Sequence, residues 1–290
     1  MQRKLTIGAV TVSAPAGLFM LIFFVAPVVL IVVYSFSTAG YYAVSGPLTF
    51  SNFTRALDLH IDRQLAWHSL EVAFFTSTIT TVLTIAVSYW LRYAPPARRS
   101  VVLFLLLITM FASYLVRIYA WRSILGPTGL INVALESLGL IHRPLGFLVF
   151  SRFAVVVTQI HWFFPYVLLV TYGGFGPLGP SLLESAQDLG AGPVTRFRQV
   201  VLPLIAMPVT TAFMFCFVLS ASDYITPQMI GGTNGSLLGD QISISFIQTG
   251  DFALGSATAI LMLVGFALIY CFLLAALKVA KLDRIQWGNS

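Results

Sequence analysis

The chain has 290 residues, of which 58% are hydrophobic and only 9% are charged. A soluble domain carries about 25% charged residues, so this composition excludes an ordinary soluble globular protein. Several apolar runs reach the roughly 20 residues that a transmembrane helix needs. We therefore predict an all-α, multi-pass membrane protein whose residues 1–290 form a single transmembrane domain.

Hydropathy predicts six transmembrane helices, at 9–35, 69–91, 101–119, 149–172, 204–226 and 253–277. Near the N-terminus, Ala14-Pro15-Ala16 resembles a signal-peptide cleavage site. This triplet precedes most of the apolar run, which is also longer than the hydrophobic region of a signal peptide. We expect an uncleaved first span. The third span is the shortest, and the sequence "YAWRSIL" could extend it.

The distribution of Lys and Arg predicts how the chain is oriented in the membrane. The N-terminus, 92–100, 173–203 and the C-terminus together hold ten bases and three acids. The opposite loops and helix ends hold six bases and seven acids. The positive-inside rule therefore places both termini in the cytoplasm. The net charge of +6 reflects this orientation and does not indicate nucleic-acid binding.

The cysteines and histidines indicate neither a metal centre nor a redox centre. Cys216 and Cys271 lie singly in apolar runs, so neither a disulfide framework nor a zinc site is expected. His161 stands alone in its predicted span, and no two histidines share a span. A membrane redox enzyme, which needs paired haem or metal ligands, is therefore disfavoured.

A polar segment, "ESAQDLGAGPVTRFRQVVLPL", separates the fourth and fifth spans on the predicted cytoplasmic side. Ser181 and Glu184 fit a capping box, and Gly190 fits a helix C-cap. A second short helix is expected at 194–201, with Pro203 opening the fifth span. Region 181–201 is therefore predicted to form a helix, a glycine turn and a helix.

The first helix of this region carries an apolar stripe and an acidic face. The stripe comprises Leu182, Leu183, Ala186 and Leu189. A helix lying on lipid headgroups usually presents bases, whereas this helix presents Glu184 and Asp188. Docking into a groove of a partner protein fits this pattern better than membrane adsorption, although both remain open from the residues alone.

The spacing of this segment resembles the E-A-A motif of the membrane permeases of bacterial ABC importers. The matching positions are Glu184, Ser185, Ala186, Gly190, Val200, Leu202 and Pro203. Ser185 stands where the motif has alanine, and Val200 where it has isoleucine. Three further stretches, "SNFTRAL", "YLVRIYAWRSILGPTGLIN" and "SASDYITPQMIGG", resemble the spermidine/putrescine branch. Importers of opines, phosphonates and ferric iron are close to that branch.

The resemblance implies a type I importer permease in a bacterial cytoplasmic (inner) membrane. It implies that Glu184, Ser185, Ala186, Gly190, Leu202 and Pro203 couple the chain to an ATPase. The expected partners are a second, related permease chain, two ATP-binding subunits and an extracytoplasmic solute-binding protein. The chain contains no G-x-x-x-x-G-K-[ST] motif. It is therefore expected to be non-catalytic, with no cofactor of its own and with ATP and Mg on the partner.

Charged and aromatic residues at the span ends are candidates for the substrate pathway. They are Asp223, Tyr224, Glu71, Trp121, Trp162 and Arg117. Asp223 is the strongest candidate because an acid at a helix C-terminus opposes the helix dipole. Acids and aromatic faces would suit a polyamine, whereas Arg117 and Arg122 would suit an anion. Arg117 and Arg122 could also snorkel, or pair with Glu136 or Asp223.

Two alternatives to this function remain open. An opine, a phosphonate or another small solute could replace the polyamine as cargo of the same permease. A secondary transporter is a remote alternative, because such proteins usually carry mid-membrane charges and internal repeats. Neither of these features is evident in this sequence.

Overall fold

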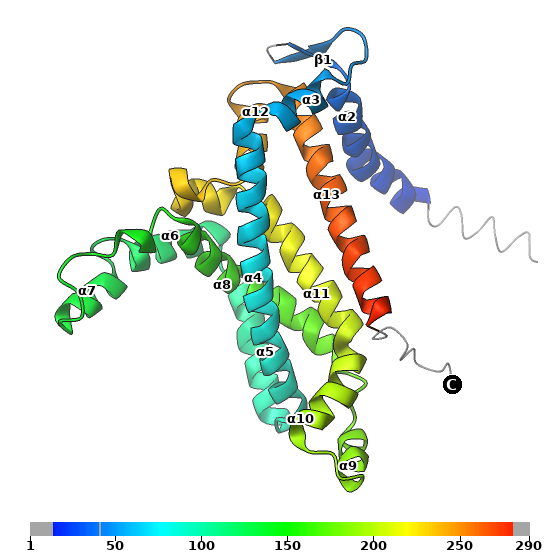
Figure 1. Cartoon of the computed structure of the whole chain (residues 1–290), viewed down its shortest axis with the longest axis vertical. Coiled ribbons are helices and arrows are strands. Elements are labelled where there is room, and N and C mark those ends of the chain that lie inside the picture. The colour runs from blue at the N-terminus through cyan, green and yellow to red at the C-terminus, as the bar shows by residue number, and fades with distance from the viewer. Residues whose placement is uncertain (1–13, 41, 281–290) are drawn as a thin grey trace, which may run out of the picture. The chain divides into compact units, whose positions relative to one another are not determined.

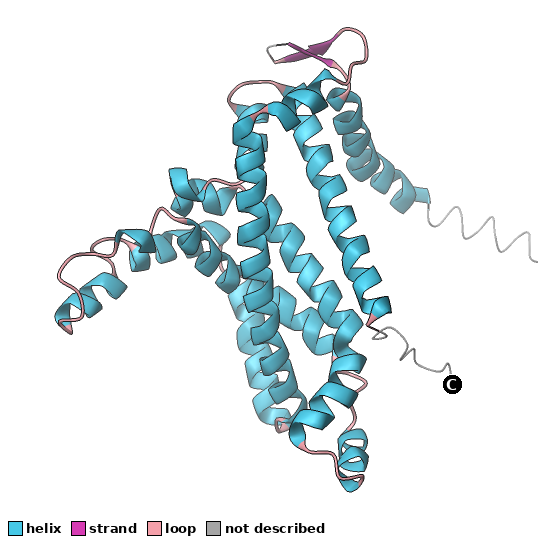
Figure 2. Cartoon of the chain, in the orientation of Figure 1, coloured by secondary structure: helices cyan, strands magenta, loops and turns pink. Residues whose placement is uncertain are grey.

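The computed structural model describes residues 14–40 and 42–280, and within them helices form almost all of the regular structure (Figure 2). The elements follow one another along the chain as coloured in Figure 1. They are η1 (Leu21–Val25), α2 (Ala26–Ser35), β1 (Thr38–Gly40), β2 (Ala43–Ser45), α3 (Ser51–Asp58), α4 (His60–Tyr93), α5 (Pro96–Met110), α6 (Tyr114–Leu125), α7 (Leu130–Ser137), η2 (Gly146–Leu148), α8 (Arg152–Gly174), α9 (Pro180–Asp188), α10 (Pro193–Arg196), η3 (Phe197–Val201), α11 (Leu202–Ser222), η4 (Pro227–Gly231), η5 (Thr233–Gly235), α12 (Leu238–Ile247) and α13 (Phe252–Val279).

Five helices among the described residues are long and apolar enough to cross a membrane, and a bent pair brings the number to six. The five are Ala14–Ser35, His60–Tyr93, Arg152–Gly174, Pro193–Ser222 and Phe252–Val279. The predicted six-span, all-α architecture is thus confirmed. The predicted start of the first span at residue 9, both chain termini and the bases Arg3, Lys4, Lys281 and Arg284 lie outside the described residues.

The third span is not the single helix that was expected over 101–119. α5 ends at Met110, α6 begins at Tyr114, and the helices around this break are bent by 95°. The 15 residues of α5 cover about 22 Å at 1.5 Å per residue, less than the roughly 30 Å of a bilayer core. The expectation of one continuous helix was therefore wrong.

The fifth span begins earlier than predicted, and proline explains its geometry. α10, η3 and α11 form one helix from Pro193 to Ser222, so the separate helix expected at 194–201 was wrong. Pro203 has no N–H, so the helix before it cannot keep a regular hydrogen-bond ladder. A π-turn at Phe197–Val201, closed by the Leu202 N–H to the Phe197 carbonyl, stands directly before Pro203. The π-turn η1 precedes Pro27 in the same way.

The described residues divide into two compact units, and each is described separately. The first unit contains residues up to 63 and 241–265. Its strands β1 and β2 pair antiparallel, with Thr38 opposite Ser45 and Gly40 opposite Ala43. The amide of buried Asn52 donates to the carbonyls of Ser35 (3.0 Å) and Ser37 (2.8 Å), so α3 is fixed to the end of α2.

The second unit contains residues 64–240 and 266 onward, and its core is built on α4, α8 and α11. In the most apolar window of each of these three spans, 39–44% of the residues are buried, whereas the windows of Ala14–Ser35 and Phe252–Val279 have none. One buried cluster joins Phe163 and Val167 of α8 to Ala212 and Cys216 of α11. The buried residues of Phe252–Val279 lie at its start, from Ala253 to Thr258.

Gly174, at the end of α8, is predicted to set how closely α8 and α11 approach. A Cβ at Gly174 would lie 2.3 Å from Cβ of Pro208, whereas nothing lies within 4 Å of a Cβ at Gly173. We expect Gly174→Ala to destabilise the protein by about 1–3 kcal/mol through overpacking. Gly173→Ala should be neutral or slightly stabilising. Thermal unfolding of both variants in the same detergent checks this, and equal melting temperatures would contradict it.

Candidate functional site

The polar segment between the fourth and fifth spans forms an exposed helix followed by a glycine turn. α9 runs from Pro180 to Asp188, and Glu184, Ser185 and Asp188 are exposed. The predicted capping box is wrong, because the N-cap is Gly179 and no side chain caps the helix. Pro180 favours the first helical position, so the helix begins one residue before Ser181 can cap it.

The predicted helix end at Gly190 is confirmed. Gly190 has a φ of +81°, a conformation that favours glycine. Its N–H donates to the Gln187 carbonyl (2.8 Å), and the Ala191 N–H donates to the Ala186 carbonyl (3.0 Å). This pair of bonds is a Schellman motif. It turns the chain into the long helix that begins at Pro193.

α9 is anchored to the base of α11 by one leucine of its apolar stripe. Leu183 is buried in a cluster with Phe175, Leu178, Val201 and Ile205. Leu182 and Leu189 remain 42% and 88% exposed. Leu202 and Pro203 are half-buried beside this cluster. The stripe therefore has two parts, because one leucine holds α9 to the membrane helices while the others stay available to a partner.

Arg92, at the end of α4, holds the turn that leads into α9. Its guanidinium donates to the carbonyls of Leu178 (2.6 Å) and Gly176 (3.2 Å). The sequence indicated Arg92 only as a base that orients the chain. Its structural role could not be predicted, because its acceptors are backbone groups more than 80 residues away in the chain. α4, α9 and α11 are thereby joined at the segment that carries the motif.

Asp223 lies where α11 ends and the next helical turn begins, and five groups donate to its carboxylate. The N–H groups of Ile225 (3.0 Å) and Thr226 (3.2 Å) donate to Oδ1. The Tyr114 hydroxyl (2.8 Å), the Gln159 amide (3.0 Å) and the Thr226 hydroxyl donate to Oδ2. Asp223 thus caps the N-terminus of the turn that follows, which offsets its unfavourable position at the end of α11.

Gln159 is a buried polar residue of the fourth span that the sequence reasoning missed. Its side chain is fully buried and accepts hydrogen bonds from the hydroxyls of Ser220 (2.6 Å) and Thr76 (3.3 Å). It also donates to Asp223 and to the Ser220 carbonyl (3.2 Å). A glutamine inside an apolar span is costly unless it is fully paired. That cost was the signal that could have identified it.

Arg117 lies close to the break between α5 and α6. It is buried, its Nη2 donates to the Ala112 carbonyl (3.1 Å), and its guanidinium lies 4.6 Å from the ring centre of Trp162. Trp162 in turn packs against Tyr114, with ring centres 4.4 Å apart. Among the described residues Arg117 forms no ion pair, so the predicted pairing with Glu136 or Asp223 is absent. Snorkelling to the surface does not describe a buried arginine either.

The remaining predicted pathway residues are not among the groups that donate to the Asp223 carboxylate. Glu71 forms an ion pair with Arg152. It follows eleven residues of α4, so it lies inside this helix and not at its end as predicted. Tyr224 is 40% exposed. Trp121 packs edge-on against His161, with ring centres 5.9 Å apart.

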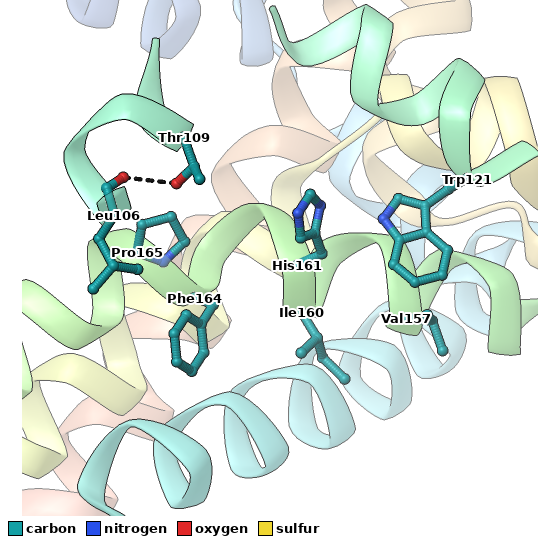
Figure 3. Close-up of a pocket in the computed structure, with 8 residues that line it drawn as sticks. All are labelled: Leu106, Thr109, Trp121, Val157, Ile160, His161, Phe164 and Pro165. Atoms are coloured by element: carbon teal, nitrogen blue, oxygen red, sulfur yellow. Dashed lines mark hydrogen bonds between the residues drawn. The ribbon is translucent and has the colours of Figure 1, made fainter. Parts of the chain in front are cut away.

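Trp121 also lines a cavity of about 350 Å³ between α5, α6 and α8 (Figure 3). The lining is Leu106, Thr109, Trp121, Val157, Ile160, His161, Phe164 and Pro165. The Thr109 hydroxyl already donates to the Leu106 carbonyl at 2.6 Å. Because no carboxylate lines this cavity, it offers no counter-charge to a cationic solute.

Comparison with known proteins covers most of the chain. Residues 100–280 match the family described as binding-protein-dependent transport system inner membrane component. The spermidine/putrescine transport system permease protein PotB of Haemophilus influenzae is 28% identical over 253 residues, 86% of this chain and 87% of the relative. The Escherichia coli protein of the same name is 29% identical over 213 residues, 73% of this chain and 76% of the relative.

A solved structure of low sequence identity shares the fold. It is a chain of a bacterial ABC transporter involved in the import of the acidic polysaccharide alginate, and it is 16% identical to this chain. The TM-score is 0.77, with 99% of this chain and 98% of the other covered.

Arg117→Lys should destabilise the protein, because lysine lacks the planar group that both lies on Trp162 and reaches the Ala112 carbonyl. We expect a loss of about 1–3 kcal/mol, since a part-buried hydrogen bond to a charged group and the guanidinium–ring contact are both lost. Arg122→Lys is the matched control. Arg122 is on the same helix as Arg117, and its guanidinium lies 5.4 Å from the centre of the Phe150 ring, but its side chain is exposed. Thermal unfolding compares the two variants, and equal losses would contradict the special role of Arg117.

Proposed function

Because the chain belongs to the family of binding-protein-dependent transport system inner membrane components, we propose that it moves a polyamine of the spermidine/putrescine type across the membrane. It is a permease subunit of an ABC importer and a multi-pass inner membrane protein. The carrying observation for the cargo is the similarity to spermidine/putrescine permeases over 73–86% of the chain.

The energy for transport comes, in this proposal, from two ATP-binding subunits that dock on α9. The exposed acids and the exposed Leu182 and Leu189 supply a mixed surface that suits a protein groove. Leu183 and Arg92 tie α9 to α11 and α4. Closure of the ATPases would therefore move α9 and the base of α11 together, and would not merely bend the turn between them. ATP and Mg belong to those partner subunits.

The complete importer in this proposal contains a second, related permease chain and an extracytoplasmic solute-binding protein. Both termini face the cytoplasm, which places α9 on the side of the ATPases. The windows of Ala14–Ser35 and Phe252–Val279 that have no buried residues leave these two spans free to meet lipid or the second permease. Substrate passes by alternating access as the two permeases rearrange.

The charges near the end of α11 favour a cation as cargo. Asp223 receives five hydrogen bonds but no ion pair from any described residue. Arg117, which an opine or phosphonate would need, is buried against Trp162 and the Ala112 carbonyl. Its other terminal nitrogen, Nη1, is buried without a hydrogen-bond partner, so an anion that reached Arg117 could still pair with it, and anionic cargo is the second candidate.

Glu184→Lys should abolish stimulation of the ATPase by cargo-loaded binding protein while the complex still assembles. The reversed charge disrupts the acidic face of α9, and Glu184 is exposed, so folding does not depend on it. Glu136→Lys on α7 is the matched control, because it reverses an exposed acid away from the loop. ATP hydrolysis in nanodiscs, at least tenfold lower for Glu184→Lys alone, is the expected result. Unchanged transport by this variant would remove α9 from the coupling role.

The cargo itself is identified by substrate-stimulated ATP hydrolysis. The complex in nanodiscs, with its binding protein, is challenged in parallel with spermidine, putrescine, an opine and a phosphonate. We expect stimulation by the polyamines alone. Stimulation by the opine or the phosphonate alone would leave the permease assignment intact and overturn the cationic cargo.

A further inference from the structure

Asp240 lies in the first turn of α12, beside the end of α11, and was not among the predicted pathway residues. The preceding residue, Gly239, packs directly against backbone: a Cβ there would lie 2.9 Å from the Ser222 carbonyl oxygen and 3.1 Å from that of Asp223. The Leu238 N–H donates to the Ser69 hydroxyl (2.8 Å), which fixes this turn to α4. The contacts of Gly239 with the end of α11 and of Leu238 with α4 therefore hold Asp240 close to Asp223.

The carboxylate of Asp240 is buried and incompletely paired. The residue is 6% exposed, and its Oδ1 has no hydrogen-bond donor. Burial raises the pKa of Asp240, nearby Gln228 and Ser236 lower it, and the charge of Asp223 raises it. Among the described residues the ion pairs are Arg55–Asp251 and Arg152–Glu71, so no base neutralises Asp240. A buried carboxylate in this state is unfavourable unless it binds a proton or a cation.

The first turn of α12 favours an acid at Asp240, but the groups that face this turn from α11 are negative. The last carbonyls of α11 point toward this junction, and a helix C-terminus carries a partial negative charge. Asp223 adds a second carboxylate, whose five donors are all neutral groups. Asp223 is therefore saturated with hydrogen bonds, whereas Asp240 has an oxygen that can still accept one.

We propose that the junction of α11 and α12 binds an alkylammonium group of the cargo, with Asp240 as the carboxylate that pairs with it. This inference rests on the proposed polyamine function and names its cation-binding residue. Because Asp240 is already out of water, an ammonium group that reaches it gains a strong charge interaction without further desolvation of the acid. The Ser222 and Asp223 carbonyls supply further acceptors for the ammonium N–H groups.

The test uses the assembled importer and three single variants of the permease. Asp240→Asn keeps the shape of the side chain and removes its charge, and Asp240→Glu keeps the charge. Asp58→Asn is the matched control, because it removes the charge of an exposed acid on α3. Two quantities are measured: the melting temperature of the purified complex with and without spermidine, and the rate of spermidine uptake into proteoliposomes.

We expect Asp240→Asn to melt at the same temperature as the wild type or higher without spermidine, because a buried, incompletely paired charge is gone. The rise in melting temperature on adding spermidine should disappear, and uptake should fall at least tenfold. Asp240→Glu should retain part of both responses, and Asp58→Asn should match the wild type.

Other outcomes overturn the proposal in distinguishable ways. If Asp240→Asn lowers the melting temperature and keeps the wild-type response to spermidine, Asp240 is a helix cap and not a cation site. If sodium chloride, but not choline chloride, replaces the effect of spermidine on the wild type, the site holds a metal cation instead of an ammonium group. If the wild type itself responds to no polyamine, the proposed cargo fails together with this inference.

Discussion

The hydrogen bonding at the end of α11 is the constraint on which the second unit depends. In a bilayer, polar groups have no water to pair with, so each must find its partner inside the protein. Asp223 meets this requirement for Tyr114 of α6, Gln159 of α8 and the backbone of the following turn. Gln159 extends the network to Thr76 of α4. Asp223 and Gln159 together therefore join α4, α6, α8 and the end of α11, which are distant from one another in the sequence.

The two ends of α11 have contrasting chemistry, and this contrast suits a permease. Its base is joined to α9 by an apolar cluster around Leu183, which moves as a unit because close-packed side chains resist deformation. Its other end leads into Asp223 and lies beside the incompletely paired Asp240 of α12. A displacement of α9 would thus reach the acidic junction through one continuous helix, from Pro193 to Ser222. The proposed coupling segment and the proposed cation site thus lie at opposite ends of the same span.

Prolines and breaks give the helices their functional shape. Pro203 follows a π-turn in the fifth span, and the third span is broken before Tyr114. A break exposes carbonyl groups that the helix can no longer satisfy. At this break Arg117 donates to the Ala112 carbonyl, and its guanidinium lies over the ring of Trp162. These contacts occupy part of the Arg117 guanidinium, whereas its Nη1 has no hydrogen-bond partner.

The sequence by itself determined the class of the protein, the number of spans and the helix-glycine-helix segment, because hydropathy and the residues around Gly190 act locally along the chain. It also indicated Asp223, through the cost of an acid at a helix end. Tertiary structure decided which polar groups meet: Gln159 with Asp223, Arg92 with the turn before α9, and Asp240 with the end of α11. These pairings join residues up to 86 positions apart, and no local pattern encodes them. The break in the third span was also missed: Arg117 donates to the Ala112 carbonyl only five residues away, but the Trp162 ring on which its guanidinium lies comes from α8.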